Sequence, residues 1–213
     1  FFQEYAPHLV GFGAYQRNLL HVRSMARMVK QALPSAWVVI GGPQATFLPD
    51  QGLLAMPEID FVSRGEGELS IAALAEAIQG DMTDRPIPGI TARTSDGTCL
   101  SGPAIDRPAD LDGYPSPWLE GVLDPAATQE SILLTSRGCT FDCAFCYTPA
   151  ASGRRIRSQS VERALQDIEY VCRKGTGRLW FADPNFSFSQ KRVVGLLQGI
   201  LERNLKPSMW IET

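Results

Sequence analysis

Three cysteines stand close together in the second half of the chain. Cys139, Cys143 and Cys146 follow the spacing Cys-x3-Cys-x2-Cys. Three thiolates on one short loop are suited to bind three irons of a cubane cluster, because iron–sulfur clusters favour soft sulfur ligands. The fourth iron then has no protein ligand and is open to a substrate. The spacing therefore predicts a [4Fe-4S] cluster with one open iron.

The remaining cysteines and the histidines favour this cluster over zinc or disulfides. A structural zinc ion needs four ligands, yet Cys99 and Cys172 are distant in sequence, as are His8 and His21. Five cysteines, three of them within eight positions, also make a poor disulfide framework. A non-catalytic iron–sulfur electron carrier or binding module is an alternative, but its cluster needs a fourth ligand, and no fourth cysteine is nearby.

Alternating strands and helices must position the cysteine motif. An apolar run ends just before the first cysteine, and the helical and strand periodicities alternate after the last one. The expected elements are a strand at 132–134, a helix at 160–173, a strand at 178–182, a helix at 190–203 and a strand at 209–211. Such alternation predicts a parallel sheet, and three strands are too few to close a barrel of eight.

The first part of the chain has the same alternation. Strands are expected at 9–13, 36–40 and 59–62, and glycines lie at the end of the first strand and in the turns after the other two. A hairpin is expected over 89–100, around the turn Ser95-Asp96-Gly97. Since the carboxyl ends of parallel strands meet at one edge, glycines there let the backbone approach a bulky ligand.

We therefore predict an α/β chain with two units. Residues 1–101 form a doubly wound, Rossmann-like domain, residues 102–130 form a Pro- and Asp-rich linker, and residues 131–213 form a second domain. The chain starts a few residues before a strand, and the second domain has only three strands. Both domains are expected to be parts of larger ones in a longer protein.

Composition excludes several classes of partner. A net charge of −3 and a pI near 5.5 do not provide the basic face that nucleic acid or an anionic membrane requires. No apolar run approaches the roughly 20 residues of a membrane-spanning helix, and the first residues do not resemble a signal peptide. The sequence predicts a cytoplasmic protein without nucleic-acid or membrane partners.

The stretch from Arg137 to Tyr147, RGCTFDCAFCY, resembles the cysteine motif of the radical S-adenosylmethionine superfamily. The resemblance implies a cluster in the loop after the first strand of a partial (β/α) barrel. It also implies that S-adenosylmethionine binds the open iron and is split into methionine and a 5'-deoxyadenosyl radical. In that family the aromatic residue before the last cysteine, here Phe145, lies against the adenine, and Tyr147 is similar in position.

A second stretch, Phe181 to Phe186 (FADPNF), resembles the Asp-Asp-Asn-Phe stretch of the same family. Pro184 replaces the second acid of that pattern. The resemblance implies that Asp183 and Asn185 face the cofactor or the substrate. The alternative is a capped turn, in which these side chains and Ser187 accept hydrogen bonds from the free amides of the next helix.

The upstream domain resembles the cobalamin-binding domain of one subgroup of the superfamily. The similar segments are 7–13 (PHLVGFG), 41–46 (GGPQAT) and 64–68 (RGEGE). The implied cobalamin-binding residues are Gly11, Gly13, Gly41, Gly42, Gly65 and Glu66. The Asp-x-His-x-x-Gly motif is absent, so the lower face of the cobalt is expected to meet a non-histidine side chain or no side chain.

Together these resemblances imply a cobalamin-dependent radical S-adenosylmethionine enzyme. The implied reaction is methyl transfer to an unactivated carbon of a small-molecule or peptide substrate, with a flavodoxin or ferredoxin type of reductant for the cluster. Oxidative cyclisation or rearrangement of a porphyrin-like or other substrate is the alternative within the subgroup. The sequence singles out no catalytic side chain.

Overall fold

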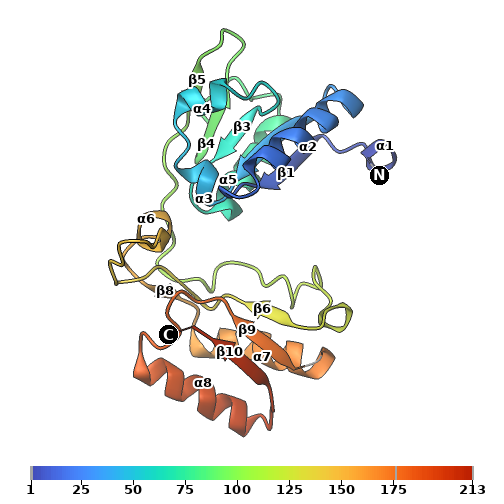
Figure 1. Cartoon of the computed structure of the whole chain (residues 1–213). Helices are drawn as coiled ribbons and strands as arrows, with labels where there is room; N and C mark the ends of the chain where they lie inside the picture. Colours follow the sequence, from blue (N-terminus) through green and yellow to red (C-terminus); the bar gives the residue numbers. More distant parts are fainter. Residues whose placement is uncertain (1, 176, 213) are drawn as a thin grey trace. The chain divides into compact units, whose positions relative to one another are not determined.

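A computed structural model describes residues 2–175 and 177–212. The chain divides into two compact units, residues 1–107 and residues 108–213 (Figure 1). This division falls inside the segment 102–130 that composition predicts to be a linker. No described helix is both long enough and apolar enough to cross a membrane.

The first unit is built on a five-stranded sheet with the order β1-β2-β3-β4-β5. The first three strands run parallel, and the last two form the predicted antiparallel hairpin. The strands are β1 (Leu9–Gly13), β2 (Trp37–Gly41), β3 (Phe61–Ser63), β4 (Ile90–Arg93) and β5 (Cys99–Ser101). The strands expected from the apolar runs are therefore all present.

Helices cover both faces of this sheet (Figure 1). The helices that pack on the two opposite faces are α2 (Leu19–Ala32) and α5 (Gly67–Gln79), and the shorter helices of this unit are α1 (Phe2–Tyr5), α3 (Pro43–Thr46) and α4 (Asp50–Leu54). Val38 and Ile40 of β2 pack in one apolar cluster with α2, whereas Val39 packs in a second cluster with Leu74 of α5. Successive strand residues point to opposite faces, so one continuous apolar run serves both helix layers. This is the doubly wound arrangement that the sequence predicts.

The second unit contains a three-stranded parallel sheet with the order β10-β9-β6. Its strands are β6 (Ser131–Leu133), β9 (Arg178–Phe181) and β10 (Ser208–Ile211), and a separate antiparallel pair joins β7 (Ser136–Arg137) and β8 (Arg157–Ser158). Its helices are α6 (Thr148–Ser152), α7 (Val161–Lys174) and α8 (Gln190–Glu202), with a short 3-10 turn, η1, at Pro125–Ala127. The three strands predicted for the second domain are present, whereas β7, β8 and α6 are too short to give a periodic signal.

Helices α7 and α8 cover the sheet of the second unit through a shared apolar cluster. Leu165 and Ile168 of α7 and Leu196 of α8 are buried in it. Helix α7 begins where its periodicity predicts, because the Ser160 hydroxyl accepts a hydrogen bond from the amide of Arg163 at 3.1 Å.

Part of the predicted linker packs into the same core. The indole of Trp118 is only 5% exposed and belongs to the cluster formed by α7 and α8. Nearby, the Ser116 hydroxyl donates a hydrogen bond of 2.5 Å to the buried carboxylate of Asp167 on α7. This segment thus contributes to the second unit, even though its composition is typical of a linker.

Candidate functional site

The three cysteines lie in one loop whose two arms meet at a neck. Strands β7 and β8 form this neck, with Ser136 opposite Ser158 and Arg137 opposite Arg157. The amide of Cys139 donates to the carbonyl of Gly153 at 3.3 Å and adds a contact between the two arms beyond this pairing. We call residues 138–156 the cysteine loop and the β7–β8 pairing its neck. The neck holds the two ends of the cysteine loop together. All three cysteines therefore lie in one closed segment of the chain.

Gly138 is the residue that lets the two arms approach. Its φ is +89°, a conformation that side chains disfavour, and a Cβ there would lie 2.4 Å from the carbonyl oxygen of Arg155. A backbone oxygen cannot move away as the end of a flexible side chain can. The glycine before Cys139 is therefore required by the neck itself.

Two thiols of the cysteine loop are accessible, and one of these two has a lowered pKa. Cys143 and Cys146 are exposed, whereas Cys139 is buried at the neck. Hydrogen bonds from the hydroxyl and the amide of Thr148 lower the pKa of the Cys146 thiol. A lower pKa favours the thiolate, which is the form that binds metal.

The three thiols of this loop are chemically suited to bind an iron–sulfur cluster. None of its three thiols is in a disulfide, and all three belong to one segment closed at its neck. Within residues 2–175 and 177–212, no three His, Cys, Asp or Glu side chains lie close enough together to hold a metal ion. The ligand set Cys139, Cys143 and Cys146 accordingly stays a prediction.

The aromatic residues beside Cys146 face solvent. Phe145 is 93% exposed, and Tyr147 is 55% exposed at the start of α6. An aromatic ring left in water has apolar surface available for a ligand to cover. The two side chains are thus accessible at the position where the family resemblance places an adenine.

Asp183 and Asn185 follow β9 and are both buried, at 1% and 8% exposure. The carboxylate of Asp183 accepts hydrogen bonds from residues at the neck of the cysteine loop, as described below. Asn185 Oδ1 accepts from the Ser187 hydroxyl at 3.4 Å. Neither residue caps the next helix, because Ser189 takes that position and accepts from the amide of Arg192. The capped-turn alternative, which assigned the cap to these side chains and Ser187, is therefore wrong.

Arg192 and Thr135 are site residues that the sequence analysis missed. Arg192 is 8% exposed and lies on the same face of α8 as the buried Leu196 and Ile200. An arginine that continues an apolar i, i+4, i+8 stripe is a signal of a buried charge, and it was available in the sequence. No comparable pattern marks Thr135.

The predicted cobalamin-binding glycines gather at the carboxyl edge of the first sheet. Gly13 pairs with Gly41 across β1 and β2, and Gly42 and Gly65 follow β2 and β3 with φ of +95° and +79°. Nothing lies within 4 Å of the Cβ position of Gly65, so the backbone there borders open space. Gly11, in contrast, lies within β1, two residues before this edge.

Thr46 joins two of these glycine turns. Its hydroxyl accepts a hydrogen bond from the amide of Gly65 at 3.1 Å and donates to the carbonyl of Gly42 at 2.9 Å. Glu66 follows directly and precedes the first residue of α5. The turns after β2 and β3 are thus held in one arrangement by a side chain that the sequence analysis did not single out.

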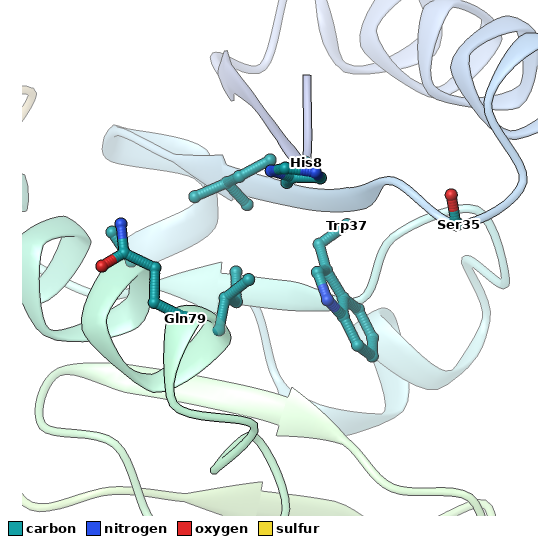
Figure 2. A pocket seen from close by; sticks show the side chains of 7 residues that line it. His8, Ser35, Trp37 and Gln79 are labelled. Atoms are coloured by element: carbon teal, nitrogen blue, oxygen red, sulfur yellow. The ribbon is translucent and has the colours of Figure 1, made fainter. Parts of the chain in front are cut away.

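A cavity of about 440 Å³ lies at the opposite edge of the same sheet. Leu9 and Trp37, the first residues of β1 and β2, line it together with His8 and Gln79 (Figure 2). It contains none of the predicted cobalamin-binding residues. The amino edge of the sheet therefore does not belong to the candidate cobalamin site.

Comparison with known proteins supports both parts of this assignment. The model of the B12 binding domain family matches residues 1–75. An uncharacterized methyltransferase of Pyrococcus horikoshii is 28% identical over 210 residues, which cover 95% of this chain and 45% of the relative. The cobalamin-dependent radical SAM methyltransferase TokK of Streptomyces tokunonensis is 30% identical over 84% of this chain and 28% of its own length. The chain thus spans less than half the length of these curated relatives.

Solved structures confirm the expected fold. The cobalamin-dependent S-adenosylmethionine radical enzyme OxsB, with aqua-cobalamin and S-adenosylmethionine bound, has a TM-score of 0.79 at 19% identity, over 98% of this chain and 30% of its own. The radical S-adenosylmethionine methyltransferase TsrM of Kitasatospora setae has a TM-score of 0.72 at 22% identity, over 95% of this chain and 42% of its own. Residues 1–75 thus match the B12 binding domain family, and nearly the whole chain is similar to radical S-adenosylmethionine enzymes that carry a cobalamin-binding domain.

Proposed function

We propose that the protein is a cobalamin-dependent radical S-adenosylmethionine methyltransferase that acts on a small-molecule or peptide substrate. One observation carries the proposal: a segment that matches the B12 binding domain precedes a Cys-x3-Cys-x2-Cys loop in the same chain. Several relatives that are similar to most of this chain are named methyltransferases. Because the chain spans less than half of those relatives, the activity is proposed for the whole protein.

In this proposal the cysteine loop holds the cluster. The thiolates of Cys139, Cys143 and Cys146 bind three irons, and the exposed rings of Phe145 and Tyr147 offer apolar faces to the adenine of S-adenosylmethionine. When bound, the cluster supplies an electron for cleavage of S-adenosylmethionine, and cobalamin carries a methyl group. Asn185 is retained as a cofactor-facing candidate, whereas the contacts of Asp183 favour a structural role at the neck.

The carboxyl edge of the first sheet is the proposed cobalamin site. Gly13, Gly41, Gly42 and Gly65 lie at this edge, and their lack of side chains leaves room for a corrin ring to approach the backbone. Glu66 lies next to Gly65 at the same edge. Gly11 is the weakest of the predicted contacts, because it is two residues inside its strand.

Oxidative ring formation on a porphyrin-like substrate is a second candidate. The observation that favours it is a relative of Rubrivivax gelatinosus named anaerobic magnesium-protoporphyrin IX monomethyl ester cyclase, which is 28% identical over 93% of this chain and 37% of its own length. The two reactions differ in their products, since only methyl transfer adds a carbon. Mass spectrometry of the product separates them.

We further propose a cytoplasmic location and a flavodoxin or ferredoxin type of reductant. Five free cysteines support a reducing compartment, where thiols persist and a cluster is protected from oxidation. An acidic net charge of −3 supports the absence of nucleic-acid and membrane partners.

The proposal can be tested with the full-length protein, prepared anaerobically and reconstituted with iron, sulfide and cobalamin. After addition of dithionite and methyl-labelled S-adenosylmethionine, we expect bound corrin, labelled methylcobalamin and 5'-deoxyadenosine. Cys143→Ala should abolish formation of 5'-deoxyadenosine and lower the iron content. Cys172→Ala is the matched control, because this thiol lies on α7 outside the cysteine loop, and it should retain both. A wild-type protein that binds neither iron nor corrin would overturn the proposal.

A further inference from the structure

Asp183 ties the end of β9 to the neck of the cysteine loop. Its Oδ1 accepts a hydrogen bond from the amide of Thr135 at 2.6 Å. Its Oδ2 accepts from the hydroxyls of Thr135 at 2.6 Å and Ser136 at 2.9 Å. Both carboxylate oxygens are thus engaged by the two residues that lead from β6 into the neck.

Arg192 of α8 joins the two arms of the same loop. Its Nη2 donates to the carbonyl of Thr135 at 3.4 Å, on the arm that leaves β6. Its Nη1 donates to the carbonyl of Gln159 at 2.5 Å, on the arm that returns to α7. The amide of Gln159 also donates to the carbonyl of Thr135 at 2.9 Å, so both arms are fixed to each other and to α8.

These two charged groups are buried, which makes their placement costly unless they are paired. Asp183 is 1% exposed and Arg192 is 8% exposed. Burial lowers the pKa of Arg192, and the negative charges of Asp183 and Asp112 oppose that shift. Buried charges of this kind contribute little net stability compared with apolar side chains, but each imposes one arrangement on the groups to which it is hydrogen-bonded.

We infer that Asp183 and Arg192 are positioning residues for the iron–sulfur cluster, because they hold the neck from which the cysteine ligands project. This inference rests on the proposed function, in which the cluster binds at the cysteine loop. Neither side chain is a ligand, and both act through Thr135, Ser136 and the backbone that reaches Cys139 three residues later. Asp183 is thereby assigned to the support of the cluster and not to contact with S-adenosylmethionine.

The test compares cluster retention in variants of the full-length, anaerobically reconstituted protein. The neck variants are Asp183→Asn, Asp183→Ala and Arg192→Gln. Asp167→Asn is the matched control, because Asp167 is a carboxylate of the same unit at 5% exposure that accepts a buried hydrogen bond from Ser116. The measurements are iron per chain, the rate of iron loss to a chelator, the EPR spectrum of the reduced cluster, and thermal unfolding.

Loss of a residue that supports metal ligands typically weakens metal binding about 10- to 100-fold. We therefore expect Asp183→Ala and Arg192→Gln to lose iron at least about tenfold faster than wild type, with an altered EPR spectrum. The rate of iron loss from Asp183→Asn should lie between the rates of wild type and Asp183→Ala, because the side-chain carbonyl oxygen of Asn can still accept a hydrogen bond from the amide of Thr135. Asp167→Asn should lower thermal stability but keep the wild-type rate of iron loss and the wild-type spectrum.

Two results would overturn the inference while leaving the proposed function intact. One is a rate of iron loss and an EPR spectrum that are the same in the neck variants as in wild type. The other is an Asp167→Asn protein that loses iron as fast as they do, which would show a general effect of stability. A wild-type protein that holds no cluster would instead refute the proposed function. If Asp183→Ala does not fold, Asp183→Asn and Arg192→Gln carry the comparison.

Discussion

The cysteines of this chain differ because their surroundings differ. Hydrogen bonds from Thr148 lower the pKa of Cys146, whereas burial raises the pKa of Cys172 on α7. Burial also raises the pKa of Cys99, and the nearby charge of Asp50 adds to this. Since the thiolate is both the nucleophile and the metal ligand, Cys146 should be more reactive than Cys99 and Cys172.

Replacing Thr148 by Val should raise the pKa of Cys146, because the hydroxyl that donates to the sulfur is removed. One pKa unit changes the thiolate fraction about tenfold well below the pKa, so alkylation of the cluster-free protein near pH 7 should become several-fold slower at Cys146. Mass spectrometry of the labelled peptides measures this rate. Cys172 serves as the internal control and should react slowly in both proteins. An unchanged rate at Cys146 would contradict the assigned hydrogen bond.

At the scale of elements, the neck depends on a glycine with little room around it. Both Gly138 and Gly177 have positive φ, +89° and +67°. A Cβ on Gly138 would meet the carbonyl oxygen of Arg155, whereas one on Gly177 would meet nothing within 4 Å. The two positions therefore share the conformational strain but differ in steric contact.

Gly138→Ala should destabilise the neck, and Gly177→Ala is its matched control. The positive φ alone costs about 1–2 kcal/mol of folding free energy, which both variants should lose. Gly138→Ala should lose more, because the backbone of one arm must shift, and it should also bind less iron after reconstitution. Denaturant unfolding and iron analysis measure the two effects. Equal losses in both variants would show that the close approach at Gly138 has no energetic consequence.

At the scale of the whole molecule, opposite charges can stabilise a buried charge, and Glu58 is an example. In the first unit Glu58 is 5% exposed and contacts Arg23 at 2.6 Å and Arg27 at 3.3 Å, both on α2. Burial alone would raise the pKa of Glu58. The hydrogen bond from Arg23 and the charges of both arginines outweigh burial, so the pKa is lowered.

This lowered pKa predicts a pH-dependent contribution to stability. The folded-state pKa of Glu58 lies below its ordinary value of 4.5, so the ion pair stabilises the fold above that pH and is lost as the pH falls through the folded-state pKa. Glu58→Gln should therefore lower the free energy of unfolding by about 1.5–3 kcal/mol at pH 7. The difference in unfolding free energy between Glu58→Gln and wild type should become smaller below pH 4.5. Denaturant unfolding at several pH values measures this difference.

Glu169→Gln is the surface comparison for this experiment. Its carboxylate contacts Arg173 at 2.8 Å and Arg203 at 3.1 Å, but the Glu169 side chain is 32% exposed and that of Arg173 is 59% exposed. An exposed ion pair contributes at most about 1 kcal/mol, so this variant should change stability little. A Glu58→Gln protein as stable as wild type at neutral pH would refute the contribution assigned to the buried pair.

The sequence by itself determined the features that depend on neighbouring residues. Apolar periodicity predicted the parallel strands and the main helices, because the spacing of apolar residues along a segment reflects which of its faces is buried. The glycine turns at 41–42 and the spacing of the three cysteines were also readable, since backbone conformation and ligand chemistry are local properties.

Only the tertiary structure decided which distant residues meet. Asp183 bonds Thr135 from 48 positions away, and Arg192 reaches the carbonyl of Thr135 from 57 positions away. Trp118 entered a core although its segment has the composition of a linker. These contacts follow from the placement of β9 beside β6, and strand order and register depend on the packing of the whole unit, which local patterns do not specify.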